Sequence, residues 1–266
     1  MIAEMWTLWQ PKSGNAESEY EDACCYAEGF GPSCARAAVA DGASTAFESQ
    51  SWVNLLVRRF VDAAGPRFDA ASFGTWLGSV QTEWARAEAA SPAVDSIYSL
   101  YEDDRVQEGT YGTFLGLELG GLDGGGATSW WRALSIGDTV LFHIRNGALV
   151  GQSPRMALAD FARGPALVHS NADRLQADCA AIVLESGGPL AAGDVVLVAT
   201  DAFAAWMIRR QESGAPVWEL VAGVDPVSFP GLVAKLRTNR EMVNDDVTVL
   251  VTRIAGDPGQ QEVAAR

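Results

Sequence analysis

The most constraining feature of this chain is a set of short acidic strings placed where apolar, β-forming runs begin or end. The strings are Glu21-Asp22, Asp41-Gly42, Asp201 and Asp245-Asp246. A carboxylate at the mouth of a buried strand is costly unless its charge is compensated. Several such carboxylates brought together would repel one another unless a cation lay between them. The pattern therefore predicts an all-oxygen site for hard divalent ions, Mg²⁺ or Mn²⁺.

The charge balance excludes some classes of partner. The chain has 34 acidic against 19 basic residues, a net charge of −15, which argues against binding to nucleic acid or to an anionic membrane. No apolar run is long enough to span a bilayer, and the N-terminal residues lack a basic-then-apolar signal pattern. We therefore expect a cytoplasmic protein with no nucleic-acid or membrane partner.

Cysteine and histidine are too few, and too irregularly spaced, to build a metal site of their own. The chain has two histidines, His143 and His169, which argues against a histidine-rich zinc site. The four cysteines follow no metal-ligand spacing, so we expect small, buried, reduced thiols. They are Cys24, Cys25, Cys34 and Cys179.

The hydrophobic periodicity predicts strands at both ends of the chain, with helices between them. Asn146-Gly147 is a strong hairpin signal within what we expect to be a continuous antiparallel meander. We expect one domain over residues 1–254 and a frayed tail over 255–266. The expected elements are strands at 22–28 and 34–40, helices at 46–63 and 69–90, an uncertain segment at 94–108, a meander over 111–152, an irregular surface insertion at 152–178, a strand before Asp201, helices at 202–212 and 228–239, and a closing strand after Asp246.

Five motifs occur in a fixed order along the chain: ED, ADG, GD, ATD and DDVTVLV. In this order they resemble the metal-dependent serine/threonine protein phosphatases of the PPM, or 2C, type, in a divergent bacterial branch. The resemblance covers roughly residues 12–254. It implies an α+β fold in which two antiparallel β-sheets pack as a sandwich, flanked by helices on both sides in four αββα layers.

The resemblance also implies a role for each motif residue. Two metal ions would be bridged by Asp41, with the carbonyl of Gly42 as a backbone ligand, and a third, more labile ion would lie nearby. The implied metal ligands are Glu21 (directly or through water), Asp22 (third ion), Asp41, Gly42, Asp138 (third ion), Asp201 and Asp245. Asp246 stands where the family often has asparagine, so it is expected only as a hydrogen-bonding neighbour.

The implied activity is hydrolysis of phosphoserine and phosphothreonine in a phosphoprotein, with a possible link to a cognate serine/threonine kinase system. Two or three Mn²⁺ or Mg²⁺ ions would activate water as the nucleophile and neutralise charge on the phosphoryl oxygens. No side chain would act as nucleophile. Two alternatives stay open: a weak or inactive scaffold that binds a partner protein, and a metal-dependent hydrolase of another phosphoester.

The sequence departs from the family pattern where the substrate phosphate would bind. Many members have an arginine four residues before the ED glutamate, and here that position is Glu17. Lys12 is the preferred substitute as phosphate-binding residue, with Arg36 as a second choice. The string DGAST provides no histidine as general acid, and Ala202 replaces the glycine of ATDG.

Each motif also has an ordinary structural explanation. Asp41-Gly42 could be a plain turn, and Asp201 could cap the following helix. Ser44 and Thr45 are expected as helix N-caps rather than nucleophiles. The tryptophans Trp130, Trp131 and Trp206 are expected in the core or an interface.

Overall fold

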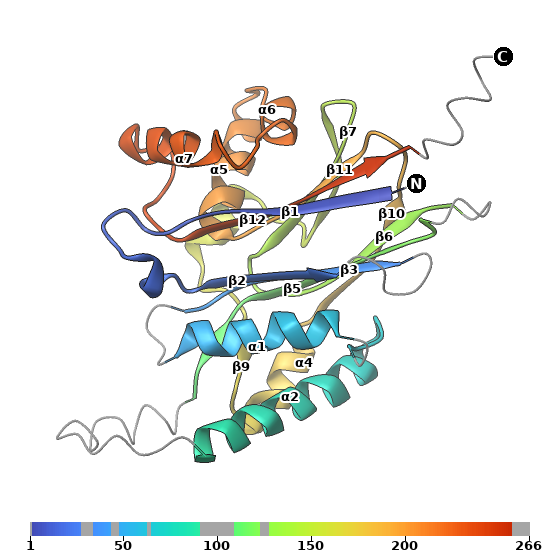
Figure 1. Ribbon diagram of the computed structural model, residues 1–266, viewed down its shortest axis with the longest axis vertical. Helices are drawn as coiled ribbons and strands as arrows, with labels where there is room; N and C mark the ends of the chain where they lie inside the picture. Colours follow the sequence, from blue (N-terminus) through green and yellow to red (C-terminus); the bar gives the residue numbers. More distant parts are fainter. Residues whose placement is uncertain are drawn as a thin grey trace.

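The computed structural model contains two five-stranded antiparallel sheets that pack face to face, with helices on both outer faces (Figure 1). It describes residues 2–27, 34–43, 48–62, 65–90, 109–122 and 128–256. The first sheet has the order β1 (Ile2–Gln10), β12 (Val247–Ala255), β11 (Val195–Ala199), β7 (Val140–Arg145), β8 (Ala148–Ser153). The second sheet has the order β10 (Val183–Pro189), β6 (Trp130–Ile136), β5 (Phe114–Gly120), β3 (Ala35–Asp41), β2 (Asp22–Ala27).

The helices divide between the two outer faces, which completes the expected four αββα layers. The first sheet is covered by α5 (Asp201–Glu212), α6 (Trp218–Ala222) and α7 (Phe229–Thr238). The second sheet is covered by α1 (Ser49–Val61), α2 (Ala70–Ala90) and α4 (Leu175–Ala180). The short elements are η1 (Glu17–Glu19), β4 (Tyr111–Gly112), η2 (Leu158–Ala162), β9 (Val168–His169) and η3 (Ala172–Arg174).

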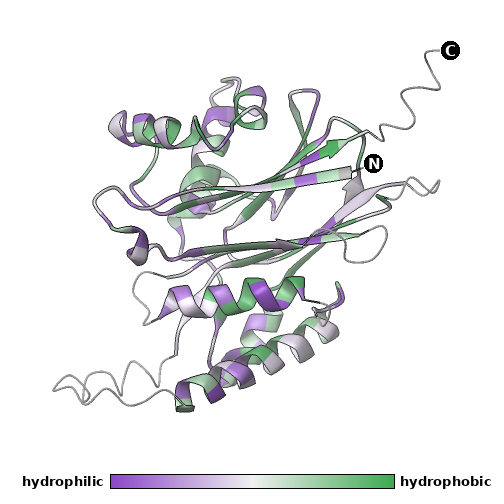
Figure 2. Cartoon of the chain, viewed as in Figure 1, coloured by the Kyte–Doolittle hydropathy of each residue, from purple (hydrophilic) through white to green (hydrophobic). Residues whose placement is uncertain are grey.

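Strand alternation builds three apolar layers, because successive side chains of a strand point to opposite faces. On β11, Val196 and Val198 pack between the sheets, whereas Leu197 packs against the helices of the first sheet. Figure 2 shows hydrophobic residues concentrated along the strands and on the helix surfaces that meet them. The apolar layer between the two sheets is the central layer. It fixes how the two sheets lie on each other, and therefore which strand ends meet.

Most of the elements expected from periodicity are present near their expected bounds. Strands β2 and β3 and helices α1, α2, α5 and α7 confirm the sequence interpretation. The β7–β8 hairpin turns at Asn146-Gly147, where both residues have positive φ (51° and 72°). The segment 94–108, the connection 28–33, Ser44, Thr45 and residues 257–266 lie outside the described part of the chain.

The expected continuous meander is wrong at one position. Strands β5 and β6 pair in the second sheet, while β7 and β8 pair in the first, so the chain crosses between sheets after β6. The crossing uses Gly137, whose φ of 102° is a conformation that side chains disfavour. Asp138 follows directly, and the crossing therefore places it at the boundary between the two sheets.

Several elements carry weaker sequence signals and were not expected. Strand β1 forms the edge of the first sheet, with Ala3 and Met5 facing the central layer. The region 152–178 is tied into the fold, because β9 pairs with β4 and α4 packs on α2. Strand β10 and helix α6 are further additions.

The cysteines also differ from expectation: all four are free thiols but half-buried rather than buried. Cys24 packs toward the central layer, and Cys25 packs toward the helices, as strand alternation predicts. Among the described residues, no helix is both long and apolar enough to cross a membrane.

Candidate functional site

Two of the acidic residues face each other at one end of the second sheet. Asp22 opens β2 and is paired with Asp41, the last residue of β3. Directly opposed residues of an antiparallel pair point to the same face, which here is the face toward the first sheet. Like charges in this arrangement destabilise a sheet unless something compensates them.

Asp22 is deeply buried and only half satisfied. The residue is 3% exposed, and its Oδ2 accepts hydrogen bonds from the hydroxyls of Thr200 (3.1 Å) and Thr248 (2.8 Å). Its Oδ1 is buried without a hydrogen-bond partner among the described residues. Burial, together with the neighbouring carboxylates Asp246 and Asp201, raises the pKa of Asp22 well above its usual range.

Three further carboxylates approach Asp41 from other elements. Asp138 lies on the crossing between sheets, Asp201 begins α5, and Asp245 lies in the loop before β12. Burial raises the pKa of Asp41 well above its usual range, and the charges of Asp22, Asp201, Asp245 and Asp138 raise it further. The structure therefore brings these carboxylates within electrostatic reach of one another, at an edge to which both sheets contribute.

The same causes act on the other members of this group. Burial raises the pKa of Asp138 to about 6. Burial, followed by the charges of Asp138 and Asp245, raises the pKa of Asp201. Asp201 is the first helical residue rather than the N-cap of α5, because the N-cap is Thr200. Burial therefore affects both residues, and neighbouring negative charge adds to it at Asp201.

Glu21 and Gly42 meet through their backbones. The amide of Gly42 donates to the carbonyl oxygen of Glu21 at 3.2 Å. A Cβ at position 42 would lie 2.7 Å from that oxygen, so this close approach requires glycine. The carboxylate of Glu21 accepts a hydrogen bond from Ser49 Oγ at 3.3 Å, which links it to the start of α1.

Asp246 fixes the backbone around the group, in keeping with its expected role as a hydrogen-bonding neighbour. Its side chain is buried, with Oδ1 accepting from the amide of Lys12 (2.7 Å) and Oδ2 from the amide of Glu21 (2.8 Å). Arg237 links the same two segments by donating hydrogen bonds to the carbonyl oxygens of Pro11 (2.8 Å) and Asp245. The segment after β1 is thereby held against the loop before β12.

Lys12 places its ammonium group between two of the predicted ligands. Its Nζ lies 3.2 Å from Glu21 Oε2 and 3.1 Å from Asp245 Oδ1. Burial alone would lower the pKa of Lys12, but the hydrogen bonds and charges of Asp245 and Glu21 outweigh it and raise that pKa. The lysine charge also offsets part of the rise in the pKa of Asp201, so Lys12 acts on three of the acidic residues.

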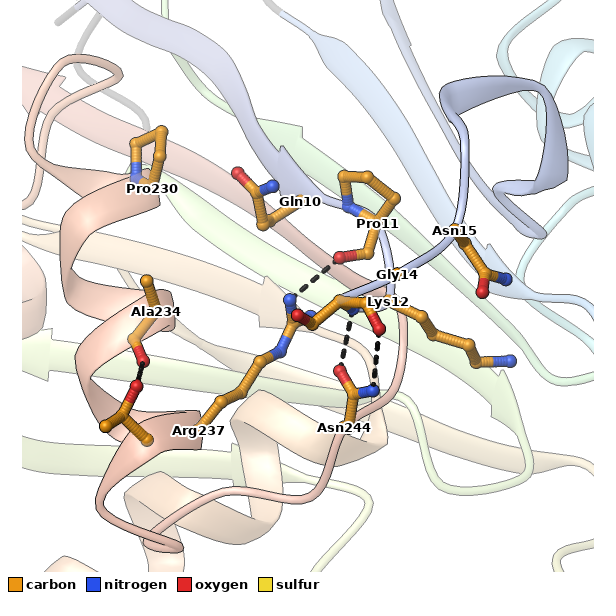
Figure 3. A pocket seen from close by; sticks show the side chains of 11 residues that line it. Gln10, Pro11, Lys12, Gly14, Asn15, Pro230, Ala234, Arg237 and Asn244 are labelled. Carbon is orange, nitrogen blue, oxygen red and sulfur yellow. Dashed lines mark hydrogen bonds between the residues drawn. The ribbon is translucent and has the colours of Figure 1, made fainter.

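A hollow of about 720 Å³ lies beside this segment. Figure 3 shows the side chains that line it. Asn244 lines it and holds Ser13, whose amide donates to Asn244 Oδ1 at 2.8 Å. The Lys12 side chain extends away from Arg237 and Asn244 in this view. It also lines a second hollow of about 440 Å³ that includes Glu21 and Ser49. Lys12 therefore stands between two open spaces next to the acidic group.

The donor set fits hard divalent cations by its chemistry. It is made of carboxylate oxygens, it carries excess negative charge, and one oxygen of Asp22 lacks any partner among the described residues. The described side chains nevertheless include no group of three or more His, Cys, Asp or Glu arranged to hold a metal ion. Electrostatic repulsion acts over longer distances than coordination, so the carboxylates influence one another without converging on one point.

Arg36, the second choice for phosphate binding, lies away from this group. Arg36 is buried on the helix side of β3, where its Nε donates to Glu118 at 2.8 Å. Glu17 is exposed on η1. Thr200, Thr248 and Arg237 were not among the residues predicted from the sequence. Both threonines adjoin predicted ligand motifs (ATD and DDVT), which is the signal that could have identified them.

No protein-family model matches the sequence, and no curated protein matches it significantly. Solved structures do match over nearly the whole chain. The serine/threonine phosphatase PstP/Ppp of Mycobacterium tuberculosis shares 14% identity, with a TM-score of 0.59 over 96% of this chain and 100% of that one. PppA, described as a regulatory component of the type VI secretion system (T6SS) in Pseudomonas aeruginosa, shares 19%, with a TM-score of 0.54 over 95% and 98%.

The catalytic domain of PstP, solved in complex with two manganese ions, is a third match. It shares 15% identity, with a TM-score of 0.54 over 96% of this chain and 99% of that one. These likenesses show that the chain has the fold of the 2C-type serine/threonine phosphatases, which confirms the fold implied by the ordered motifs.

Proposed function

We propose that this chain is a member of the 2C-type phosphatases and hydrolyses phosphoserine and phosphothreonine esters in proteins. The observation that carries the proposal is the gathering of Asp22, Asp41, Asp138, Asp201 and Asp245 at one edge of this fold. Buried and partly buried carboxylates that repel one another are expected where a cation completes the site. Its substrate would be a phosphoprotein, produced by a serine/threonine kinase.

The residues that would hold two or three Mn²⁺ or Mg²⁺ ions are those of the acidic group: Glu21, Asp22, Asp41, the carbonyl of Gly42, Asp138, Asp201 and Asp245. Such ions supply Lewis acidity, which activates water and neutralises charge on a phosphoryl group. A chain of net charge −15 has particular need of such neutralisation, because its own field repels a phosphate dianion.

The surrounding residues of the chain orient this group. Thr200 and Thr248 hold one oxygen of Asp22, and the other oxygen is buried without a hydrogen-bond partner among the described residues. Asp246 fixes the backbone of Glu21 and Lys12. Lys12 is the proposed phosphate contact, because it is the basic side chain beside both the acidic group and the adjoining hollows.

A direct test is hydrolysis of a phosphothreonine peptide by the purified protein with Mn²⁺, with Mg²⁺ and with excess EDTA. We expect turnover that requires added metal and is abolished by EDTA, because carboxylate ligands hold these ions more weakly than thiolates or imidazoles hold zinc. Full activity in excess chelator, from protein free of metal, would contradict the proposal. Parallel assays with non-protein phosphoesters would identify a hydrolase of another phosphoester.

A partner-binding scaffold is the second candidate. Two observations favour it: Glu17 replaces the usual arginine, and the described acidic side chains do not converge in a metal-holding arrangement. A Mn²⁺ titration that follows turnover separates the two candidates. The scaffold predicts no turnover with any phosphoester, even at a metal concentration that saturates binding.

A further inference from the structure

We propose that the ammonium group of Lys12 is a built-in counter-ion for Glu21 and Asp245, and that a divalent metal ion displaces it and turns it toward the incoming phosphate. The inference rests on the proposed function, because it takes Glu21 and Asp245 as metal ligands. It adds a positioning role for Lys12 that couples metal loading to phosphate capture.

The first support is the location of the charge. Lys12 Nζ lies within 3.2 Å of one oxygen from each carboxylate, so it occupies the space between them. A divalent ion bound by both carboxylates would lie within a few ångströms of Nζ. Like charges at that distance repel strongly in a partly buried site. The ammonium and the metal ion therefore exclude each other from this position.

The second support is the contrast between a fixed backbone and a movable side chain. The amide of Lys12 donates to Asp246, Arg237 holds Pro11, and Asn244 holds Ser13. The backbone on both sides of Lys12 is thus anchored, and displacement must occur by rotation of the side chain. Lysine has a flexible stem for such a rotation.

The third support is the space available for the displaced group. Lys12 lines both hollows beside the acidic group, of about 440 and 720 Å³. Rotation into either hollow keeps Nζ next to the site instead of removing it to bulk solvent. A phosphate that approaches the metal-loaded edge would then meet a cation released from its carboxylate partners.

The exchange also has a consequence for the affinity of the site for a metal ion. Lys12 partly neutralises Glu21 and Asp245, which removes part of the electrostatic attraction that would draw in a metal ion. Metal binding must then replace two existing ion pairs, and its apparent affinity is lower than that of the same carboxylates without the lysine.

The first experiment uses the wild-type protein and measures acetylation of individual lysines by mass spectrometry. The chain has only two lysines, so Lys235 on the last turn of α7 serves as an internal reference. We expect slow acetylation of Lys12 without metal and an increase of about fivefold or more at saturating Mn²⁺, with no change at Lys235. An unchanged rate at Lys12, while electron paramagnetic resonance shows bound Mn²⁺, would overturn the exchange.

The second experiment compares Lys12→Met with Lys235→Met. We expect Lys12→Met to tighten Mn²⁺ binding, measured by electron paramagnetic resonance, by about tenfold, which is the effect of roughly 1.4 kcal/mol. Lys235→Met should bind Mn²⁺ like the wild type. Unchanged or weaker binding by folded Lys12→Met would overturn the exchange, and the acetylation experiment decides the matter if this variant does not fold.

Neither readout depends on turnover, so the two proposals can fail separately. Metal-dependent exposure of Lys12 without hydrolysis of any phosphopeptide would support the exchange and contradict the phosphatase. Metal-dependent hydrolysis with unchanged reactivity of Lys12 would support the phosphatase and overturn the exchange. If Mn²⁺ binds neither the wild type nor Lys12→Met, the exchange is overturned.

Discussion

Asp22 lies directly opposite Asp41 across the β2–β3 pair, and both side chains point toward the other sheet. Asp22 is buried, and its charge adds to the effect of burial in raising the pKa of Asp41 above its usual range. An arrangement that is unfavourable for the metal-free protein is a common property of functional sites, where stability is given up for chemistry.

Replacing Asp41 should separate its contribution to activity from its cost in stability. We expect Asp41→Asn to lower metal-dependent phosphopeptide turnover by about a hundredfold or more, because it removes the charge of a proposed metal ligand. In EDTA at pH 8, the same change should raise the free energy of unfolding by about 1 kcal/mol, because it relieves repulsion. Turnover assays and urea denaturation measure the two quantities. Asp173→Asn, on an exposed turn, is the control, and wild-type activity in Asp41→Asn would show that the assignment of the ADG motif is wrong.

Asp246 should stabilise the backbone conformation at Lys12 and Glu21. Asp246→Ala leaves the amides of Lys12 and Glu21 without their acceptor, so we expect a loss of about 2–3 kcal/mol in the free energy of unfolding. Asp246→Asn keeps one acceptor and should lose about half as much. Hydrogen exchange at the two amides provides a local measure. Asp245→Ala serves as the neighbouring control, and equal protection of both amides in the two alanine variants would contradict this role.

Glu17 stands where many 2C-type phosphatases have an arginine. It lines a hollow of about 370 Å³ together with Tyr20 and Asp22. We expect Glu17→Arg to lower KM for a phosphopeptide, by roughly threefold, more than it changes kcat, because the new charge attracts the substrate in the ground state as well. Steady-state kinetics test this.

The control for Glu17→Arg makes the same change of net charge elsewhere. Glu4 is an exposed residue of β1 and provides that comparison as Glu4→Arg. An equal decrease in KM for both variants would mean that long-range charge, rather than a contact at position 17, is responsible.

A separate buried network should set the acid limit of stability. Asp194 accepts hydrogen bonds from Arg145, His143 and the amide of Ala191. Burial opposes ionisation, but these hydrogen bonds outweigh it and lower the pKa of Asp194 below its usual value. As the pH falls, Asp194 therefore becomes protonated in the unfolded chain at a higher pH than in the folded protein. The stabilisation is complete above the ordinary aspartate pKa of about 4 and is lost below it.

We expect Asp194→Asn to lower the free energy of unfolding at pH 7 by about 2–4 kcal/mol, because it leaves charged Arg145 without its partner. The difference from wild type should shrink as the pH falls below about 4. Urea denaturation between pH 3 and pH 7 measures it, again with Asp173→Asn as control. A difference that stays constant over this range would contradict the assignment of the effect to ionisation of Asp194.

Local signals in the sequence were sufficient for elements whose geometry is decided locally. Asn146-Gly147 predicts a tight hairpin because few other residues adopt both positive φ values. Gly137-Asp138 resembles such a turn in sequence, but the strands on either side of it, β6 and β7, belong to different sheets. Nothing in these two residues distinguishes a hairpin from a crossing, because the choice depends on which strands β6 and β7 meet later in the chain.

The candidate site likewise has some features that local sequence predicts and others that depend on tertiary structure. The acidic strings identified residues that the fold does gather at one edge, since strand ends are visible in the sequence. The contact between Lys12 and Asp245 was not foreseen, because it depends on the antiparallel pairing of β1 with β12. The hydroxyls of Thr200 and Thr248 reach Asp22 only because the two sheets pack face to face.

The crossing at Gly137-Asp138 and the threonine bonds to Asp22 have a shared consequence. The acidic edge is built from both halves of the sandwich, so its geometry is right only when the sheets lie in one particular alignment. By thermodynamic reciprocity, an ion that binds this edge would also hold the sheets in that alignment. Occupancy of the acidic edge by the ion and rigidity of the interior are then two measures of one equilibrium. A substitution in the central layer, at Leu117 or Val198, would therefore alter the affinity for the ion at an edge that it does not contact.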